Sequence, residues 1–330
     1  MEALTEKLLN NFQRDFPLKP QPFAAIAQLL NTDAGTVLRR LKELQDKGAV
    51  SRVGAVFKPN TVGASTLAAM SIPEPLLESI ASIVSGFQQV NHNYEREHDY
   101  NLWFVATAAN QPELAETLRK IETRTGYPVL SLPLVKDYHI DLGFRMQLEN
   151  QPEPRALEGD QRHPAVAEIP TDVCSVEDLI AAIQDGLPLV ARPYQQIAER
   201  LGWSEQKVIA RLGQLIDSGV IKRLGVVVRH HELGYRANAM VVWDVPDSEV
   251  DQLGYLLGRQ DCVTLCYQRP RHIPHWPYNL FCMVHGRDHA EVLACVDRMS
   301  EGLGLDNIDR TVLFSGRRFK QRGARYRGVH

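Results

Sequence analysis

The chain repeats its own sequence, and this internal duplication limits its possible folds more than any other feature. A shift of 171 positions superimposes the first part of the chain on its second half: Pro17 on Pro188, Ile26-Ala27 on Ile197-Ala198, Arg40-Leu41 on Arg211-Leu212, and Arg52-x-Gly54 on Arg223-x-Gly225. After a small insertion, Tyr94-x-Arg96 matches Tyr267-x-Arg269, and Tyr100-Asn101-Leu102 matches Tyr278-Asn279-Leu280. Solenoid repeats are shorter. We therefore expect a duplicated two-part unit, which builds within one polypeptide what a symmetric dimer builds from two.

Each repeat begins with the pattern of a winged helix-turn-helix, over residues 1–60 and again over 173–232. In the first repeat, helical apolar spacing over 22–30 is followed by a turn with Thr32 as the expected N-cap, and Gly48 ends a second helix. Residues 49–56 then read as the wing strand. The second repeat predicts helices over 193–201 and after Ser204, ended by Gly219, and a strand over 220–228.

Each wing leads into a segment with the order βαββαβ, over residues 61–147 and 233–330. The predicted elements of the first are 66–72, 75–85, 90–96, 100–106, 112–123 and 127–134, and those of the second are 237–245, 248–258, 263–269, 278–284, 289–299 and 308–314. This order predicts a ferredoxin-like unit and an α+β fold class. Residues 148–172 are mostly polar and contain four prolines, which is typical of a linker.

The charge balance does not favour nucleic acid as a partner. The net charge is −3 and the pI is near 6.4, whereas nucleic-acid-binding domains are usually basic. The exception is the C-terminal tail, which is either solvated or binds anions and contains Arg317, Arg318, Lys320, Arg322, Arg325 and Arg327. Neither a membrane-length apolar run nor a signal-peptide pattern is visible, so we expect a cytoplasmic protein.

The sequence predicts no metal or cofactor of the protein's own. Five cysteines include Cys262 and Cys266, four residues apart, but no second close pair completes a zinc framework, so reduced buried thiols are expected. No glycine-rich phosphate loop and no Schiff-base lysine pattern is present either.

The strand predicted over 90–96 carries an unusual set of side chains on one face. At a period of two residues, His92, Tyr94 and Arg96 point the same way, where a face packed on a core would carry aliphatic residues. Burying three such groups without partners costs about 1–3 kcal/mol each. Guanidinium, phenol and imidazole together suit a polyanion, because Arg binds carboxylates and His can deliver a proton near neutral pH. The sequence therefore predicts a ligand site on this strand.

A winged helix followed by a ferredoxin-like unit resembles the Lrp/AsnC regulators, in which such units pair sheet to sheet and bind small molecules at that interface. His92-Asn93-Tyr94-x-Arg96 with Tyr100-Asn101-Leu102-Trp103-Phe104, and Trp276-Pro277-Tyr278-Asn279-Leu280-Phe281 in the other repeat, resemble the siroheme decarboxylases more specifically. The resemblance is to the type that fuses two related subunits in one chain. It implies removal of two acetate carboxyls from siroheme to give 12,18-didecarboxysiroheme, on the route to heme d1 or, in other microbes, to ordinary heme.

This resemblance and the strand pattern together define the candidate site. Candidates for the chemistry are His92, His98, His272, His275, Tyr94 and Tyr267. Candidates for holding the substrate are Arg96, Arg269, Arg271, Tyr100, Tyr278, Asn101, Asn279, Trp103 and Trp276. The expected partner is siroheme or another iron tetrapyrrole, whose iron arrives with the substrate. The histidines are candidates either for the proton donor or for an axial ligand of that iron.

The repeats differ where function is expected. His92 is replaced by Leu265, and the turn Glu97-His98-Asp99 is replaced by the longer segment 270–277, so the two sites should not be equal. A DNA-binding regulator is the alternative, supported by Arg52 and Lys222-Arg223 in the wings but not by Glu205 and Asp217 on the second recognition helix. A heme-sensing module without turnover would share every site residue. The pseudo-dimer within one chain leaves a further homodimer open.

Overall fold

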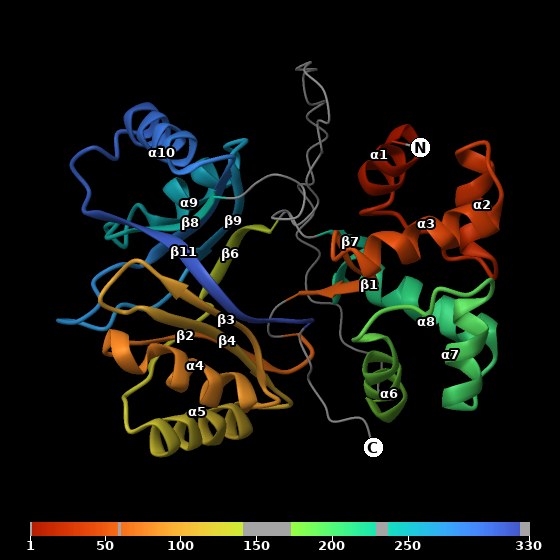
Figure 1. Ribbon diagram of the computed structural model, residues 1–330, viewed down its shortest axis with the longest axis horizontal. Helices are drawn as coiled ribbons and strands as arrows, with labels where there is room; N and C mark the ends of the chain where they lie inside the picture. Colours follow the sequence, from red (N-terminus) through yellow and green to blue (C-terminus); the bar gives the residue numbers. More distant parts are fainter. Residues whose placement is uncertain (1, 59–60, 141–172, 229–236, 324–330) are drawn as a thin grey trace. The chain divides into compact units, whose positions relative to one another are not determined.

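The computed structural model describes residues 2–58, 61–140, 173–228 and 237–323 (Figure 1). These residues form two compact units, and each unit takes elements from both repeats. One unit contains the winged helices and the other contains the ferredoxin-like segments. The tandem α+β fold predicted from the sequence is confirmed, whereas the exact domain limits stay a prediction and the predicted linker lies outside the described residues.

The winged-helix unit contains two copies of three helices and a strand. The elements are α1 (Glu2–Asn11), α2 (Pro22–Leu29), α3 (Ala34–Asp46), β1 (Val50–Phe57), α6 (Val173–Ile183), α7 (Pro193–Leu201), α8 (Glu205–Asp217) and β7 (Ile221–Val228). Ser204 caps α8 as predicted, and its hydroxyl accepts from the Lys207 amide. The prediction for α3 is wrong by one residue: Asp33, not Thr32, caps it and accepts from the Thr36 amide at 2.9 Å.

The two wings pair with each other instead of forming separate hairpin tips. β1 and β7 are antiparallel, with Gly54 opposite Gly225. The segment that follows α1 crosses onto β7, and an added Cβ at Gly225 would lie 2.3 Å from the Gln13 carbonyl oxygen. An added Cβ at Gly54 would lie 2.9 Å from the Gly186 Cα. The repeated Arg-x-Gly motif is therefore explained by close backbone approach between the repeats.

The ferredoxin-like unit contains a sheet of each repeat, and β11 joins the two sheets into one continuous order of nine strands. Its elements are β2 (Ala64–Met70), a 3₁₀ turn (Glu74–Leu76), α4 (Leu77–Gly86), β3 (Val90–Arg96), β4 (Leu102–Ala108), α5 (Gln111–Thr125), β5 (Leu130–Pro133), β6 (Lys136–Ile140), β8 (Ala237–Trp243), α9 (Val250–Gly258), β9 (Val263–Gln268), β10 (Leu280–Gly286), α10 (His289–Leu303) and β11 (Arg310–Gln321). The strand order is β5-β2-β4-β3-β11-β8-β10-β9-β6. Each repeat contributes the 4-1-3-2 order of a ferredoxin-like sheet.

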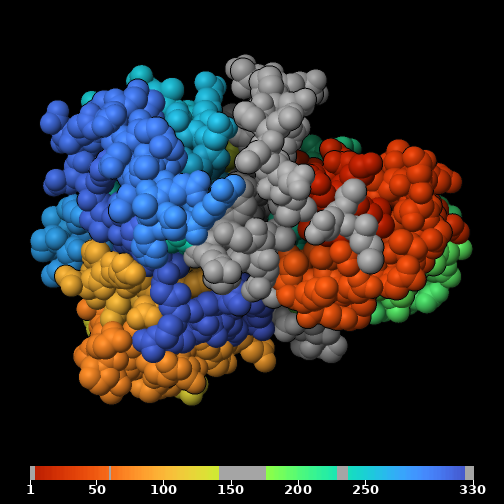
Figure 2. Space-filling model, turned by 45° about the horizontal axis from the view of Figure 1, so that its top comes forward, coloured from red at the N-terminus to blue at the C-terminus, as the bar shows by residue number. Residues whose placement is uncertain are grey.

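The last strands are exchanged between the repeats. The first part of β11 pairs with β8 of its own repeat, and residues from Ser315 onward pair with β3 of the first repeat. Reciprocally, β6 continues from β5 and pairs with β9 of the second repeat. Figure 1 shows β11 crossing from the second repeat onto β3, and Figure 2 shows dark blue atoms near the C-terminus beside the gold atoms of the first ferredoxin-like segment.

Three apolar cores follow from this arrangement. One fills the space between the first sheet and α4 and α5, and another lies between the second sheet and α9 and α10. The third joins the two sheets face to face and combines Ala69, Trp103 and Leu132 with Met240, Val242, Trp276, Phe281 and Leu313. The sheet-to-sheet pairing expected from the resemblance is therefore confirmed. In the described part of the chain, every helix is too short or too polar to cross a bilayer.

Candidate functional site

The polar row of the first repeat lies on β3. The His92 and Tyr94 rings stack with centroids 6.3 Å apart, and Arg96 follows on the same face. The alternate residues point to the other side, where the Asn93 amide donates to the Ala81 carbonyl and the Ser85 hydroxyl of α4, both at 3.0 Å. The face that carries His92, Tyr94 and Arg96 is thus the one turned toward the opposite sheet, because Tyr94 lies opposite Trp103 of the inter-sheet core.

Arg96 and Arg269 occupy equivalent positions in the two repeats. Arg96 donates to the Leu313 carbonyl of β11 at 2.9 Å, and Arg269 donates to the Leu132 carbonyl of β5, so each arginine contacts a strand of the other repeat. Burial lowers the pKa of each guanidinium to about 10. The Nε atom of each is buried without a hydrogen-bond partner in the described residues. Such a donor favours an anionic acceptor nearby.

His98 lies in the turn that follows β3, at the edge of a pocket. Its Nδ1 accepts from the Tyr100 amide at 3.0 Å, so the neutral ring carries its proton on Nε2. Burial lowers the pKa of His98, and Asp99 opposes this effect. The pocket has a volume of about 590 Å³ and is lined by Ser71, Ile72, Pro73, His98, Asp99, Asn101 and Tyr127. Of these lining residues, only His98 and Asn101 were predicted as site residues.

In the second repeat, the corresponding connection places its own tryptophan, Trp276, between the two sheets. Trp276 is fully buried and contacts the rings of His98, Tyr100, Trp103, Tyr278 and Phe281. His272 is exposed and its Nε2 lies 2.8 Å from the Ser131 carbonyl oxygen of β5, while His275 is exposed. The structure therefore brings Trp276, but neither His272 nor His275, into the inter-sheet core.

Arg271 is held by groups of its own repeat. Its guanidinium binds Asp244 at 2.8 Å, Asp247 and the Val245 carbonyl. All three guanidinium nitrogens of Arg271 therefore have a partner within the second repeat, which gives this residue a structural role. Its predicted role in holding substrate stays a prediction.

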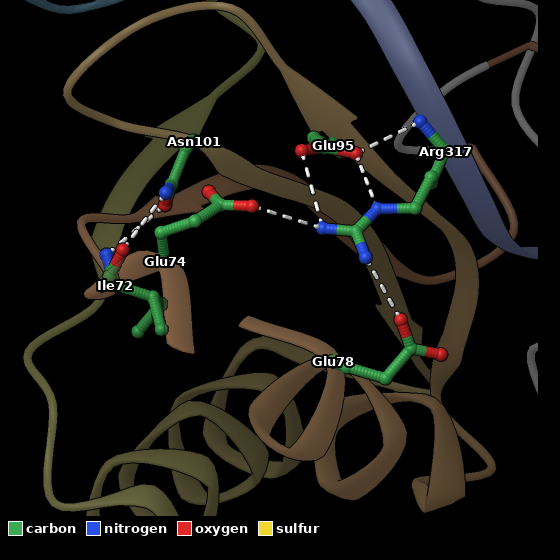
Figure 3. A network of polar contacts seen from close by, with 6 residues as sticks. All are labelled: Ile72, Glu74, Glu78, Glu95, Asn101 and Arg317. Carbon is green, nitrogen blue, oxygen red and sulfur yellow. Dashed lines mark hydrogen bonds and ion pairs between the residues drawn. The ribbon is translucent and has the colours of Figure 1, made fainter. Parts of the chain in front are cut away.

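The two asparagines of the repeated Tyr-Asn-Leu motif clamp neighbouring backbone. Asn101 accepts from the Ile72 amide at 3.0 Å and donates to the Ile72 carbonyl at 2.8 Å (Figure 3). Asn279 does the same to Val245, at 3.0 and 2.9 Å. Both amide atoms of each side chain are therefore engaged, which provides a structural reason for the motif in both repeats.

The remaining predicted aromatics also contribute to structure. The Trp103 indole donates to the Tyr100 carbonyl at 2.5 Å, and the Tyr278 hydroxyl lies 2.6 Å from the Thr311 hydroxyl. The Arg269 guanidinium carbon lies over the Tyr267 ring, 5.3 Å from the ring centroid. Burial raises the pKa of the Tyr267 phenol. These residues shape the inter-sheet space rather than line the pocket beside His98.

The basic tail is in large part a strand that fastens the two repeats together. Arg317 points from β11 to Glu74, Glu78 and Glu95 (Figure 3), and its closest contact is 2.7 Å to Glu95. Hydrogen bonding to Arg317 lowers the pKa of Glu95. Lys320 donates to the Ser85 and Phe87 carbonyls at the end of α4. The sequence signal for this segment was the crowding of basic residues, of which Arg325 and Arg327 lie outside the described residues.

The cysteine prediction is wrong for one pair. Cys262 and Cys295 form a disulfide that links the start of β9 to α10. The spacing of Cys262 to Cys266 suggested no partner, because the sequence could not show that α10 lies against Cys262. Cys266 and Cys282 are buried free thiols, as predicted, and the side chain of Cys174 lies outside what the structure describes. The described residues contain no cluster of three or more His, Cys, Asp or Glu side chains arranged for a metal.

Of the wing residues that supported a DNA-binding regulator, Arg52 and Arg223 donate to backbone carbonyls, whereas Lys222 is exposed. Arg223 is only 8% exposed and donates to the Gln13 carbonyl at 2.9 Å. Arg52 donates to the Ala55 carbonyl at 3.1 Å. Because β1 and β7 pair with each other, these two arginines are not presented as wing tips to a phosphate backbone.

Comparisons with known proteins agree with this architecture. The sequence model of the AsnC-like ligand binding domain matches residues 62–139 and 232–320. The model of the siroheme decarboxylase NirDL-like HTH domain matches residues 5–50 and 177–222. Both families therefore occur twice in the chain, in step with the internal duplication.

Whole-length relatives are similar as well. The chain is 45% identical over 325 residues to the siroheme decarboxylase NirDL subunit of Paracoccus denitrificans, covering 98% of this chain and 97% of the relative. A crystal structure of the siroheme decarboxylase NirDL superimposes with a TM-score of 0.70 at 29% identity, covering 98% of this chain and 94% of that one. A second structure, a co-complex with an iron-uroporphyrin III analogue, has a TM-score of 0.68 at 27% identity, with the same coverage.

Proposed function

Because the chain belongs to the siroheme decarboxylase family, we propose that it removes the two acetate carboxyls of siroheme as CO₂. The product is 12,18-didecarboxysiroheme, and the reaction class is that of a carboxy-lyase. The resemblance found in the sequence is thereby confirmed at the level of the family. The co-complex of the related enzyme with an iron-uroporphyrin III analogue supports an iron tetrapyrrole as the ligand of this chain.

The reaction defines what the protein must supply. The bond between each acetate CH₂ and its carboxyl carbon breaks, CO₂ leaves, and the electron pair stays on the CH₂ carbon, where the conjugated macrocycle delocalises it. A proton then reaches that carbon, which becomes a methyl group. The chain must therefore provide a proton donor and cations that hold the remaining carboxylates in place.

The environment of His98 carries this proposal. Its Nδ1 is fixed by the Tyr100 amide, which leaves a proton on Nε2, and the ring borders the pocket of about 590 Å³. Burial lowers the pKa of His98, and its imidazolium, which forms when Nδ1 takes a proton and gives up the hydrogen bond from Tyr100, is therefore a stronger acid than an exposed one. Arg96, two residues earlier, supports carboxylate binding because its buried Nε has no partner in the described residues.

The proposal also includes the roles predicted for the other histidines, the cofactor requirement, the location and the partners. His92, His272 and His275 remain candidates for a second proton donor or for an axial ligand of the substrate iron. We propose that the reaction needs no cofactor beyond that iron, that it takes place in the cytoplasm, and that neither nucleic acid nor a membrane is a partner. A further homodimer stays an open prediction.

Anaerobic incubation with siroheme, followed by mass spectrometry, tests the activity. The expected result is loss of two carboxyl groups as CO₂. Titration of the Soret band in parallel separates the alternatives. A spectral change without mass loss would favour a heme-sensing module, and an unchanged spectrum would contradict the ligand itself.

A further inference from the structure

The exchanged last strands create two equivalent strand pairs, β3 with β11 and β9 with β6. In the first pair, Arg318 lies opposite Tyr94 and Gln321 lies opposite His92. In the second pair, Asp137 lies opposite Tyr267 and Ile140 lies opposite Leu265. Each pair therefore presents four residues in the same relative positions, two from each repeat.

Opposed residues of antiparallel strands project on the same side of the sheet. The alternate residues of the first pair, Asn93 and Lys320, both contact α4, so Tyr94 and Arg318 face the other way. The neighbouring Arg317 also points toward α4 and the glutamates around it (Figure 3). The first face, defined by His92, Tyr94, Arg96, Arg318 and Gln321, is therefore the one turned toward the opposite sheet.

The second face, defined by Leu265, Tyr267, Arg269, Asp137 and Ile140, has the same plan but different chemistry. Tyrosine and arginine are shared by both faces. At the other three positions, imidazole is replaced by isobutyl, guanidinium by carboxylate, and amide by an aliphatic chain. The first face has two guanidiniums and an imidazole, whereas on the second face Asp137 offsets the charge of Arg269.

This difference is selective for a polycarboxylate. Arg318 is exposed, and its guanidinium donates to the Gln321 amide oxygen at 3.1 Å, so the two side chains are ordered against each other at the surface of β11. A guanidinium held this way binds a carboxylate with parallel hydrogen bonds. On the second face, the negative charge of Asp137 weakens the attraction of Arg269 for a carboxylate.

We propose that the tetrapyrrole binds through its carboxylates to the first face only, and that Arg318 of the C-terminal strand is a substrate-binding residue. This inference rests on the proposed function, and it adds which strand pair holds the substrate. On the second face, Arg269 donates to the Leu132 carbonyl and lies over the Tyr267 ring. One tetrapyrrole is bound per chain, and the second repeat contributes to that site through its exchanged last strand.

Titration of the whole chain with iron-uroporphyrin III, followed at the Soret band, tests the proposal. One equivalent should bind per chain. Arg318→Ala and Arg318→Gln should each weaken binding by about 10- to 100-fold, which corresponds to loss of a charged hydrogen bond. Arg318→Asp, which copies the second face, should weaken binding further. The matched substitution on the second face, Asp137→Ala, should change the dissociation constant by less than about threefold.

Binding of heme, which has fewer carboxylates, is the second measurement. It distinguishes a substrate-binding role of Arg318 from a purely structural one. Arg318→Ala should affect heme binding less than iron-uroporphyrin III binding, whereas a folding defect would weaken both equally. Two equal binding sites, an Arg318→Ala variant with unchanged affinity, or an Asp137→Ala variant as weak as Arg318→Ala would each overturn the assignment. Should the unmodified chain itself fail to bind the tetrapyrrole or to decarboxylate siroheme, the proposed function falls instead.

Discussion

The two ferredoxin-like segments share a backbone plan and differ most in the connection between their central strands. In the first repeat, a short turn places His98 beside a pocket. In the second repeat, the longer connection 270–277 folds back and buries Trp276 between the sheets. The asparagine clamps and the buried arginines are preserved in both. Duplication thus kept the asparagine clamps and the buried arginines and changed the connection beside the pocket, so the two repeats are not equivalent at this place.

The largest expected effect concerns the histidines of the two connections. His98→Ala should lower turnover by about 10²–10⁴-fold while leaving tetrapyrrole binding largely intact, as expected for loss of a general acid. His92→Ala, His272→Ala and His275→Ala should be measured alongside, with both turnover and the visible spectrum. A histidine that ligates iron would alter the spectrum first. If none of the four variants loses more than threefold in activity, the site assignment is wrong.

Substitution of Trp276 tests whether the connection of the second repeat stabilises the packing of the two sheets. Trp276→Ala should lower the free energy of unfolding by about 3–5 kcal/mol, because it empties a fully buried position between the two sheets. Urea denaturation measures this change. Ile273→Ala in the same connection is the control and should have little effect, since Ile273 is 68% exposed. Equal stability of the two variants would mean that the loop does not hold the sheets together.

Removing either asparagine clamp should destabilise the protein, but the loss of unfolding free energy should differ between the two. Asn279→Ala should lower the free energy of unfolding by about 1–3 kcal/mol, because the Val245 amide and carbonyl lose their partner in a buried setting. Asn101→Ala should have a smaller effect, since Asn101 is only half-buried and water can replace it. Thermal and urea unfolding of the two variants provide the comparison. A larger loss for Asn101→Ala would reverse the order of burial inferred for the two clamps.

The pH dependence of turnover should report His98. Its pKa is lowered below the usual 6.5, so the donor is already mostly neutral at neutral pH. If His98 donates the proton, turnover should fall by about tenfold per pH unit above that lowered pKa. The same shift lowers stability as pH falls through 6.5 toward the folded pKa, because the unfolded chain binds the proton more readily. If the His98→Ala variant shows the same fall in kcat with rising pH, the titrating group is not His98.

The smallest expected effect is on nucleic acid. Selection from random-sequence DNA at moderate salt should return no enriched motif, because Arg52 and Arg223 donate to carbonyls within the paired wings. A reproducible palindromic consensus would instead support the regulator reading, and would show that the recognition helices act without their wings.

Much of the fold could be predicted because helix and strand periodicity record which face of an element is buried. The periodicity of residues 90–96 predicted β3 to the residue, and Ser204 was identified as a cap from its position. Periodicity does not record the partner of a strand. The exchange of β6 and β11 was therefore not predicted, and the closing strand expected over 127–134 proved to be β5 followed by a separate β6.

The sequence suggested residue types for the candidate site, whose roles stay predictions, but it did not show how these residues are arranged. His92, Tyr94 and Arg96 were singled out because polar groups are unusual on a strand of a core sheet, and His98 because it lies close to them in the sequence. Arg318 and Gln321 were not identified as site residues, since only the β3–β11 register brings them opposite Tyr94 and His92. The disulfide between Cys262 and Cys295 depends likewise on a helix that the sequence could not place against β9.

The exchange of last strands makes the two repeats mutually dependent for folding. A chain cut between β6 and α6 would give two fragments, each with a strand whose hydrogen-bonding edge is completed only by the other fragment. Expressed alone, either fragment would expose an edge strand and be prone to aggregation. Expressed together, the fragments should reassemble by trading strands, which is how two separate polypeptides could form the same molecule that this chain forms by itself.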